Sequence, residues 1–121
     1  MTNAGLFLSL TSVVVFAAAV GCKSTAERGT FESVIEVFSE QCLVCHSEVG
    51  KSGKLSLETV ESILAGGKSG PAVVPGEPKA SLLIVRLRAL NGTQVMPQGG
   101  PPLPEEKIKL IELWIAAGAK P

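Results

Sequence analysis

The run Cys42-Leu43-Val44-Cys45-His46 constrains the fold of this chain more than any other feature of its sequence. Two thiols stand three residues apart, which is close to one helical turn, and an imidazole follows the second thiol directly. The chain has no other histidine, and its 121 residues suffice for one small domain. Any fold that it adopts therefore holds these three side chains near one another.

The spacing of this motif matches the Cys-x-x-Cys-His pattern of covalent haem c attachment. Two thiols one turn apart can form thioethers with the two vinyl groups of one porphyrin, and the adjacent imidazole then lies beneath the iron as its proximal ligand. From Cys42, Cys45 and His46 we therefore predict one covalently attached haem c.

Three other kinds of site would use the same residues. A zinc site needs a fourth ligand, and the only further cysteine is Cys22, 20 residues before the motif. A redox-active dithiol is expected in a βαβ context, which the sequence does not show. A disulfide between Cys42 and Cys45 suits an oxidising compartment, but it would close a very small loop. These sites remain the alternatives to a haem.

The sixth iron position has one candidate side chain, Met96. The single histidine is already used, and we expect Met1 to be removed with the leader described below. Pro97 disfavours helical backbone at Met96, which suits a loop that directs a thioether at a flat ring. Ligation by histidine and methionine raises the reduction potential of a haem. The alternative is that Met96 fills a gap in the core, with the iron five-coordinate or bound to water or Lys.

The chain begins with an uncharged, mostly apolar segment, because its first charged side chain is Lys23. The apolar run from Leu6 to Gly21 has 16 residues, fewer than the roughly 20 that span a bilayer. It ends in small residues, as signal peptides do. Ala19-Val20-Gly21-Cys22 resembles the lipobox of bacterial lipoproteins, whose cysteine is lipidated. The alternative is an uncleaved membrane anchor.

This pattern divides the chain into three parts. We expect a lipoprotein signal peptide over 1–21, a polar tether over 22–29 and the folded domain over 30–121. A lipid on Cys22 would hold the domain on the periplasmic side of a bacterial membrane. Export also accounts for the odd number of cysteines, since two would bond to haem and one to lipid.

The composition limits both the partners and the core. Eleven basic and eleven acidic side chains leave no net charge, so no general field attracts nucleic acid. After the leader only three aromatic residues remain, namely Phe31, Phe38 and Trp114. A domain this small is marginally stable without disulfides, metals or cofactors. A haem would fill the middle of such a core.

Apolar residues recur at helical spacing in four segments, and no stretch alternates convincingly with period two. The expected helices and their inward residues are one capped by Thr30 (Phe31, Val34, Ile35, Phe38), one capped by Ser56 and ended at Gly66 (Leu57, Val60, Ile63, Leu64), one over 78–90 (Leu82, Leu83, Leu87), and one from Pro104 to Gly118 (Ile108, Ile111, Trp114, Ile115). We therefore expect an all-α fold with loop-rich connections, in which the first and last helices meet at the aromatic residues.

From about Phe38 to Ala119 the chain resembles the planctomycete-type cytochrome c domain, a branch of the class I cytochrome c fold. The matching residues are Cys42, Cys45 and His46, Leu55 and Leu57, Gly66-Gly67 with Ser69-Gly70, Val74-Pro75-Gly76, Ser81-Leu82-Leu83, Met96-Pro97, and Trp114-Ile115 with Gly118-Ala119. The resemblance implies about four helices wrapped around one haem. It also implies thioethers at Cys42 and Cys45 and axial ligation by His46 and Met96.

These observations predict a monohaem c-type cytochrome that passes single electrons to and from other redox proteins. No acid/base pair or nucleophile remains outside the motif, so we expect an electron carrier rather than an enzyme. The alternatives are a haem enzyme or gas sensor with an open distal position, and a module in which haem is only structural. Arg86 and Arg88 are either partners of the haem propionates or solvent-facing members of the third helix.

Overall fold

The structure is a computed structural model that describes residues 29–121. Four α-helices form its frame, and the described residues contain no β-strand. The helices are α1 (Phe31–Gln41), α2 (Val60–Ala65), α3 (Leu82–Leu87) and α4 (Glu105–Ala116), and short 3₁₀ turns occur at Ser52–Lys54, Pro78–Ala80 and Leu90–Gly92. The predicted all-α fold of four helices with loop-rich connections is confirmed.

The predictions for the start of the chain are not tested by this structure. The signal peptide over 1–21, the lipidated Cys22 and all of the tether except Gly29 lie outside the described residues. Between Gly29 and Pro121, none of the helices combines the length and the apolar character that crossing a membrane requires.

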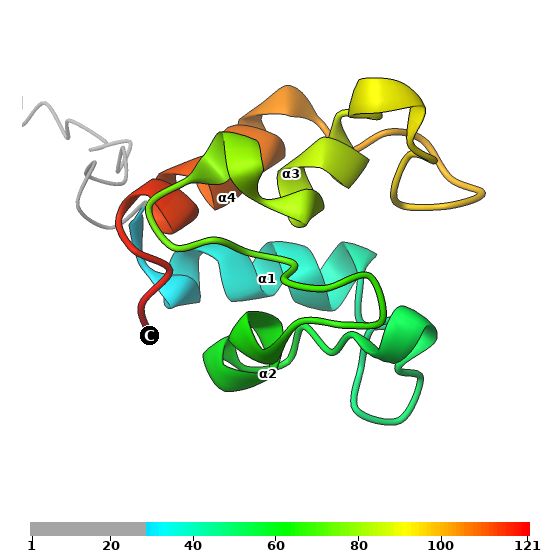
Figure 1. The fold of residues 1–121 in the computed structure, drawn as a ribbon, viewed down its shortest axis with the longest axis horizontal. Coiled ribbons are helices and arrows are strands. Elements are labelled where there is room, and N and C mark those ends of the chain that lie inside the picture. Colours follow the sequence, from blue (N-terminus) through cyan, green and yellow to red (C-terminus); the bar gives the residue numbers. More distant parts are fainter. Residues whose placement is uncertain (1–28) are drawn as a thin grey trace, which may run out of the picture.

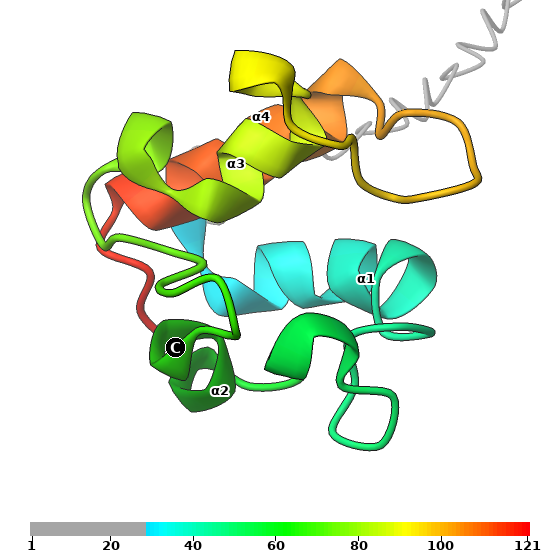
Figure 2. The same ribbon diagram turned by 45° about the vertical axis from the view of Figure 1, so that its right-hand side comes forward.

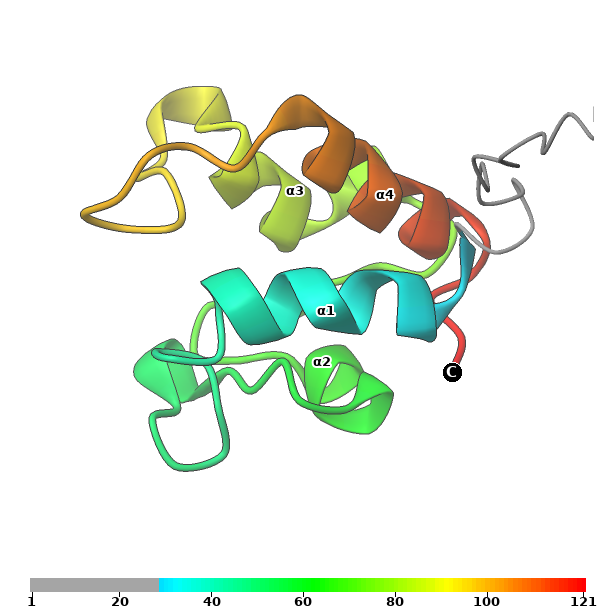
Figure 3. The same cartoon turned by 180° about the vertical axis from the view of Figure 1, so that it is seen from behind.

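Helix α1 occupies the middle of the molecule. Helices α3 and α4 lie on one side of it and α2 on the other (Figure 1), and turning the molecule by 45° or by 180° preserves this order (Figure 2 and Figure 3). The segment after α1, which carries the cysteines and the histidine, lies at the same end as the loop between α3 and α4. The fold therefore brings the two predicted ligand segments to one end.

The aromatic residues pack together where α1 meets α4. The ring of Trp114 lies 5.7 Å from that of Phe31 and 6.2 Å from that of Phe38, measured between centroids. Trp114 has no exposed surface, and its Nε1 donates a hydrogen bond of 2.8 Å to the carbonyl of Lys120. The predicted meeting of the first and last helices at these residues is confirmed.

The ends of α1 and α4 fall close to the predicted positions. Thr30 and Pro104 occupy the two N-cap positions. Gly118 adopts a φ of 103° just after α4, a backbone conformation that favours glycine and ends a helix. The residues predicted to face inward on α4 are all buried: Ile108, Ile111, Trp114 and Ile115.

Helix α2 begins later than the sequence predicts. The predicted cap, Ser56, is buried and accepts a hydrogen bond from the Glu58 N–H within the preceding turn. The observed cap is Thr59, which exchanges hydrogen bonds with Ser62 in a capping box. The prediction that Leu64 faces inward is also wrong, because this side chain is 40% exposed.

The single helix predicted over 78–90 is interrupted. Ser81 is fully buried with an extended backbone, and its hydroxyl accepts a hydrogen bond from the Val74 N–H at 2.9 Å and donates one to the Glu77 carbonyl at 2.9 Å. These bonds separate the 3₁₀ turn at Pro78–Ala80 from α3, since a serine side chain can replace helical backbone bonds. Ala89 then adopts a left-handed conformation with a φ of 49°, after which α3 does not continue.

Candidate cofactor site

The C-terminal end of α1 positions the two thiols. The N–H of Cys42 still bonds to the Phe38 carbonyl at 2.8 Å, in helical register. The N–H groups of Cys45 and His46 then both bond to the Cys42 carbonyl, at 3.1 and 2.9 Å. The motif therefore forms a tight turn that continues α1, and all three side chains start from that turn.

The loop after the motif is tied back onto it by backbone bonds. The N–H of Leu57 bonds to the His46 carbonyl at 2.8 Å, and the N–H of Ser52 bonds to the Cys45 carbonyl at 2.8 Å. A second contact joins this loop to the segment after α2, where a Cβ on Gly67 would lie only 2.7 Å from the Gly53 carbonyl oxygen. Glycine at position 67 therefore permits the close approach of two backbone segments.

A cavity of about 490 Å³ opens beside the motif. This volume lies within the range of roughly 300–1,000 Å³ that is typical of cofactor and ligand sites. The lining residues are Gln41, Cys42, Val44, Cys45, His46, Ser52, Gly53, Leu55, Leu57, Gly67, Ser69, Gly70, Ala72, Leu82, Leu83, Arg86, Leu87, Met96, Pro97 and Gln98. All four side chains predicted to bind the haem are therefore brought together at one cavity.

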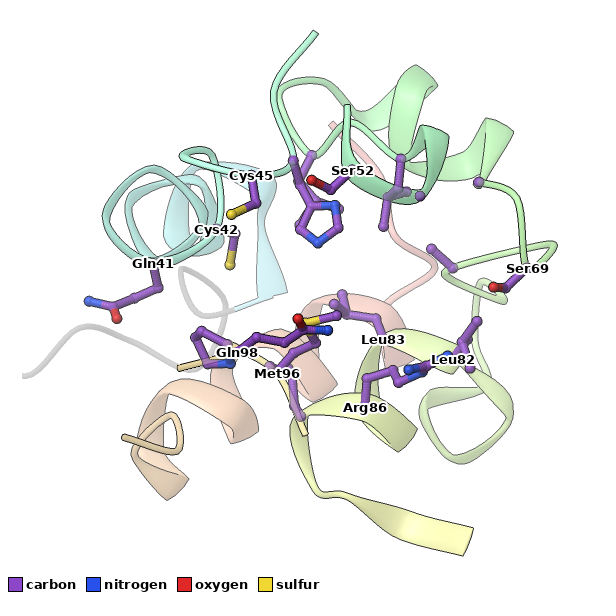
Figure 4. A pocket seen from close by; sticks show the side chains of 18 of the residues that line it. Gln41, Cys42, Cys45, Ser52, Ser69, Leu82, Leu83, Arg86, Met96 and Gln98 are labelled. Carbon is purple, nitrogen blue, oxygen red and sulfur yellow. The ribbon is translucent and has the colours of Figure 1, made fainter. Parts of the chain in front are cut away.

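The labelled side chains stand on two opposite walls. Cys42 and Cys45 belong to one wall, while Met96 and Leu83 belong to the facing wall (Figure 4). His46 lines the same cavity. A flat group bonded to the cysteines would therefore have the methionine on the side away from the motif.

One ring nitrogen of His46 has no hydrogen bond to the described residues. Its Nδ1 is buried and has no hydrogen-bond partner in the part of the chain that the structure describes. A buried polar atom without a partner is uncommon and calls for an explanation. A histidine that binds a metal normally has one ring nitrogen on the ion and the other hydrogen-bonded. The described part of the chain therefore leaves Nδ1 of His46 unpartnered, His46 lines the cavity, and the donor set there fits a haem.

The zinc site and the redox-active dithiol fit the structure less well than a haem does. Burial raises the pKa of the Cys42 thiol to about 11, so at neutral pH this residue lacks the thiolate character of a redox-active dithiol. Between residues 29 and 121 no group of three His, Cys, Asp or Glu side chains could hold a metal ion. Cys42 and Cys45 are free cysteines in the structure.

Met96 is held by its backbone to the end of α3. Its N–H bonds to the Arg86 carbonyl at 3.0 Å, and its side chain packs against the hydrophobic core. Thr93, earlier in the same loop, donates from its hydroxyl to the Leu90 carbonyl at 2.8 Å. These bonds fold the loop back on α3 and leave the methionine at the cavity wall.

The two arginines have different surroundings. Arg88 does not line the cavity, and its guanidinium bonds to Glu105 and Glu112 on α4, so it is not placed to meet a propionate there. Arg86 does line the cavity, and its guanidinium has no hydrogen bond or ion pair within residues 29–121. Of the two, only Arg86 can meet an anionic group there.

Sequence reasoning missed several residues of this site. Leu82 was expected in the core, but it is half-buried and lines the cavity. Gln41 and Gln98 also line it, and no pattern in the sequence points to them. The role of Gly67 in the close backbone contact had one signal, the paired glycines that were interpreted as the end of a helix.

Comparison with known proteins agrees with this geometry. Residues 42–100 match the family model described as Planctomycete cytochrome C, a segment that starts at the first thiol and ends after Met96. No curated protein and no solved structure gave a match. The match covers every residue predicted to bind the haem, and the resemblance inferred from the motifs is confirmed. Over residues 42–100 the chain is therefore similar to the planctomycete cytochrome c family.

Proposed function

We propose that this protein is a monohaem c-type cytochrome that passes single electrons between redox proteins. The match of residues 42–100 to a cytochrome c family model supports haem c and an electron carrier rather than an enzyme. The observation that carries the proposal is the convergence of Cys42, Cys45, His46 and Met96 on one cavity, from segments about 50 residues apart. Each of the four side chains then has a distinct role.

Cys42 and Cys45 would bond the haem to the chain, and His46 and Met96 would bind its iron. When bound, the haem supplies an iron centre that exchanges one electron at a time. The turn after α1 fixes the histidine, and the bond between the Met96 N–H and the Arg86 carbonyl holds the loop of the methionine. Two fixed ligands would keep structural change small when the charge changes.

The aliphatic walls of the cavity contribute a second effect. Leu55, Leu57, Leu83 and Leu87 line it, so water has few polar partners inside. A dry surrounding disfavours the oxidised centre, which carries one more positive charge, and methionine ligation acts in the same direction. We therefore expect a higher potential than for a haem bound by histidine and water. Arg86, at the wall, is the candidate partner for a propionate.

The proposed location is the periplasmic side of a bacterial membrane. A signal peptide over 1–21 and a lipid on Cys22 would leave a tether of at most about 25 Å before the domain, at roughly 3.3 Å per residue. The proposal rests on the apolar leader and the lipobox-like residues alone. Mass spectrometry of the exported protein tests it, since an acylated Cys22 at the N-terminus supports it and an intact leader contradicts it.

Absorbance spectra of the ferric protein test the ligand assignment. Methionine ligation gives a sulfur-to-iron charge-transfer band, which should be present in the wild type and absent in Met96→Ala. Gln94→Ala is the matched control, because Gln94 is an exposed residue of the same loop and should leave the band intact. A high-spin wild type whose spectrum Met96→Ala does not alter would favour a haem enzyme or gas sensor. Pigment extracted by acidified organic solvent would contradict covalent attachment.

A further inference from the structure

The segment that carries Met96 begins and ends at residues that bind each other. The chain leaves α3 at Arg88, forms the loop with the methionine, and enters α4 at Glu105. The guanidinium of Arg88 meets the Glu105 carboxylate through two parallel bonds, from Nη1 to Oε2 at 2.8 Å and from Nη2 to Oε1 at 2.9 Å. This ion pair joins two residues that are 17 positions apart in the sequence, with Met96 near the middle of the segment between them.

A second carboxylate completes the contact. The Nε of Arg88 donates to Oε1 of Glu112 at 3.0 Å, two turns further along α4. One guanidinium thus makes three hydrogen bonds to two side chains of one helix. Isolated surface ion pairs contribute little to stability. Bidentate arginine pairs and networks of several charges contribute more. Arg88 and Glu112 are also partly shielded, with 27% and 30% of their side chains exposed.

This contact bears directly on the position of the methionine. The Met96 N–H bonds to the Arg86 carbonyl in the last turn of α3, two residues before Arg88. Among the described residues, the bonds of Arg88 are the only ion pairs that join the end of α3 to α4. Without them, the last turn of α3 and the loop that follows it would be held to α4 by the apolar packing between the two helices and no longer by ion pairs. The loop would then open at less cost, because its two ends would no longer be joined.

We propose that Arg88, Glu105 and Glu112 form a clamp that holds Met96 on the iron and so determines how readily an external ligand displaces it. The inference rests on the proposed function, since it takes Met96 as the distal ligand. None of the three residues lines the cavity, so they act as positioning residues through the loop rather than by contact with the haem. The clamp favours electron transfer over ligand binding in this protein.

The test is a titration of the haem-loaded ferric protein with imidazole, which competes with methionine for the iron. Loss of the sulfur-to-iron band measures the displacement. Arg88→Gln should raise the apparent affinity for imidazole about fivefold, the scale of a lost surface network. Glu112→Gln removes one of the three bonds and should give a smaller increase. Arg88→Lys keeps the positive charge but cannot form the two parallel hydrogen bonds to Glu105. Its affinity for imidazole should therefore lie between those of the wild type and Arg88→Gln.

Lys107→Gln is the matched control. Lys107 pairs with Glu40 at 2.7 Å and ties α4 to α1, outside the loop that carries the methionine. This variant should leave imidazole affinity unchanged even where it lowers the melting temperature. Salt at 1 M should narrow the difference between the wild type and Arg88→Gln, because it screens the exposed part of the clamp.

Each outcome bears on a separate claim. An unchanged imidazole affinity in Arg88→Gln, or equal increases in Arg88→Gln and Lys107→Gln, overturns the clamp while the ligand assignment stands. A wild type without the sulfur-to-iron band overturns the ligand assignment and the clamp together. If Arg88→Gln does not fold, Glu112→Gln decides the question alone, and an affinity equal to that of the wild type then rejects the clamp.

Discussion

Replacing Trp114 with alanine tests the aromatic contact that joins α1 to α4. This side chain has no exposed surface and lies against the rings of Phe31 and Phe38. It also donates a hydrogen bond to the Lys120 carbonyl, which holds the last residues against α4. Alanine would remove the ring, the two aromatic contacts and the hydrogen bond together.

The expected loss is large for a domain of this size. Truncating a buried tryptophan to alanine costs about 3–5 kcal/mol. The aromatic pairs account for about 0.5–1.5 kcal/mol each and the hydrogen bond for about 1 kcal/mol within that total. In a domain of fewer than 100 residues each kcal/mol lowers the melting temperature by about 4–8 °C, so the loss corresponds to about 12–40 °C.

Thermal unfolding of the haem-loaded protein, followed by far-ultraviolet circular dichroism, measures this loss. The matched control is Leu113→Ala, one position earlier on α4, where the side chain is 41% exposed. We expect the control to change the free energy of unfolding by less than about 1 kcal/mol. Should Trp114→Ala lower the melting temperature no more than Leu113→Ala does, the aromatic contact cannot be a main source of stability.

Three further predictions follow from single contacts. Arg88 holds the pKa of Glu105 below its usual value of 4.5. The ion pair therefore stabilises the fold above pH 4.5, and this stabilisation is lost as the pH falls below that value. Melting temperatures of the wild type and Glu105→Gln should therefore converge in acid. Gly67→Ala should destabilise the protein by about 1–3 kcal/mol, because the new Cβ meets the Gly53 carbonyl, and an unchanged denaturant midpoint would contradict this. Arg86→Gln should lower the midpoint potential, since it removes a positive charge at the cavity; a redox titration showing no shift would remove Arg86 from the site.

The pattern of apolar residues predicts the two long helices well. On α4 the inward residues recur at spacings of three and four, and the structure buries all of them, from Ile108 to Ile115. The start of α1 after Thr30 was predicted for a similar reason, since Phe31, Val34 and Phe38 share one face. A long amphipathic helix repeats its signal over several turns, so one ambiguous residue does not alter the assignment.

The short helices depend on side-chain hydrogen bonds that periodicity does not reveal. Whether Ser56 or Thr59 caps α2 is decided by the return bond from Ser62, and both residues are good caps by type. Ser81 interrupts the segment from 78 to 90 because it binds the Val74 N–H, in a loop that precedes it. Helix α2 has only six residues, so the change of cap from Ser56 to Thr59 moves its start by half of its length.

Some residues of the candidate site can be inferred from neighbouring sequence, whereas other contacts arise only from the fold. The motif at Cys42–His46 is local, so its chemistry can be inferred from spacing. Met96 was assigned by elimination, and the structure brings it to the same cavity. The partners of Arg88 could not be inferred, because Glu105 and Glu112 lie 17 and 24 residues away and only the packing of α3 on α4 brings them near.

The distribution of the core residues explains why a chain with so few aromatic side chains forms a domain. Phe31, Phe38 and Trp114 are gathered at the contact of α1 with α4 and fill it with ordinary side-chain packing. The cavity beside the motif is lined by none of these three residues, and leucines form the largest group among its lining side chains. Protein interiors are close-packed, and the side chains that line an open cavity of about 490 Å³ lack neighbours on one side. A bound haem would supply those contacts and would complete the core beside the motif.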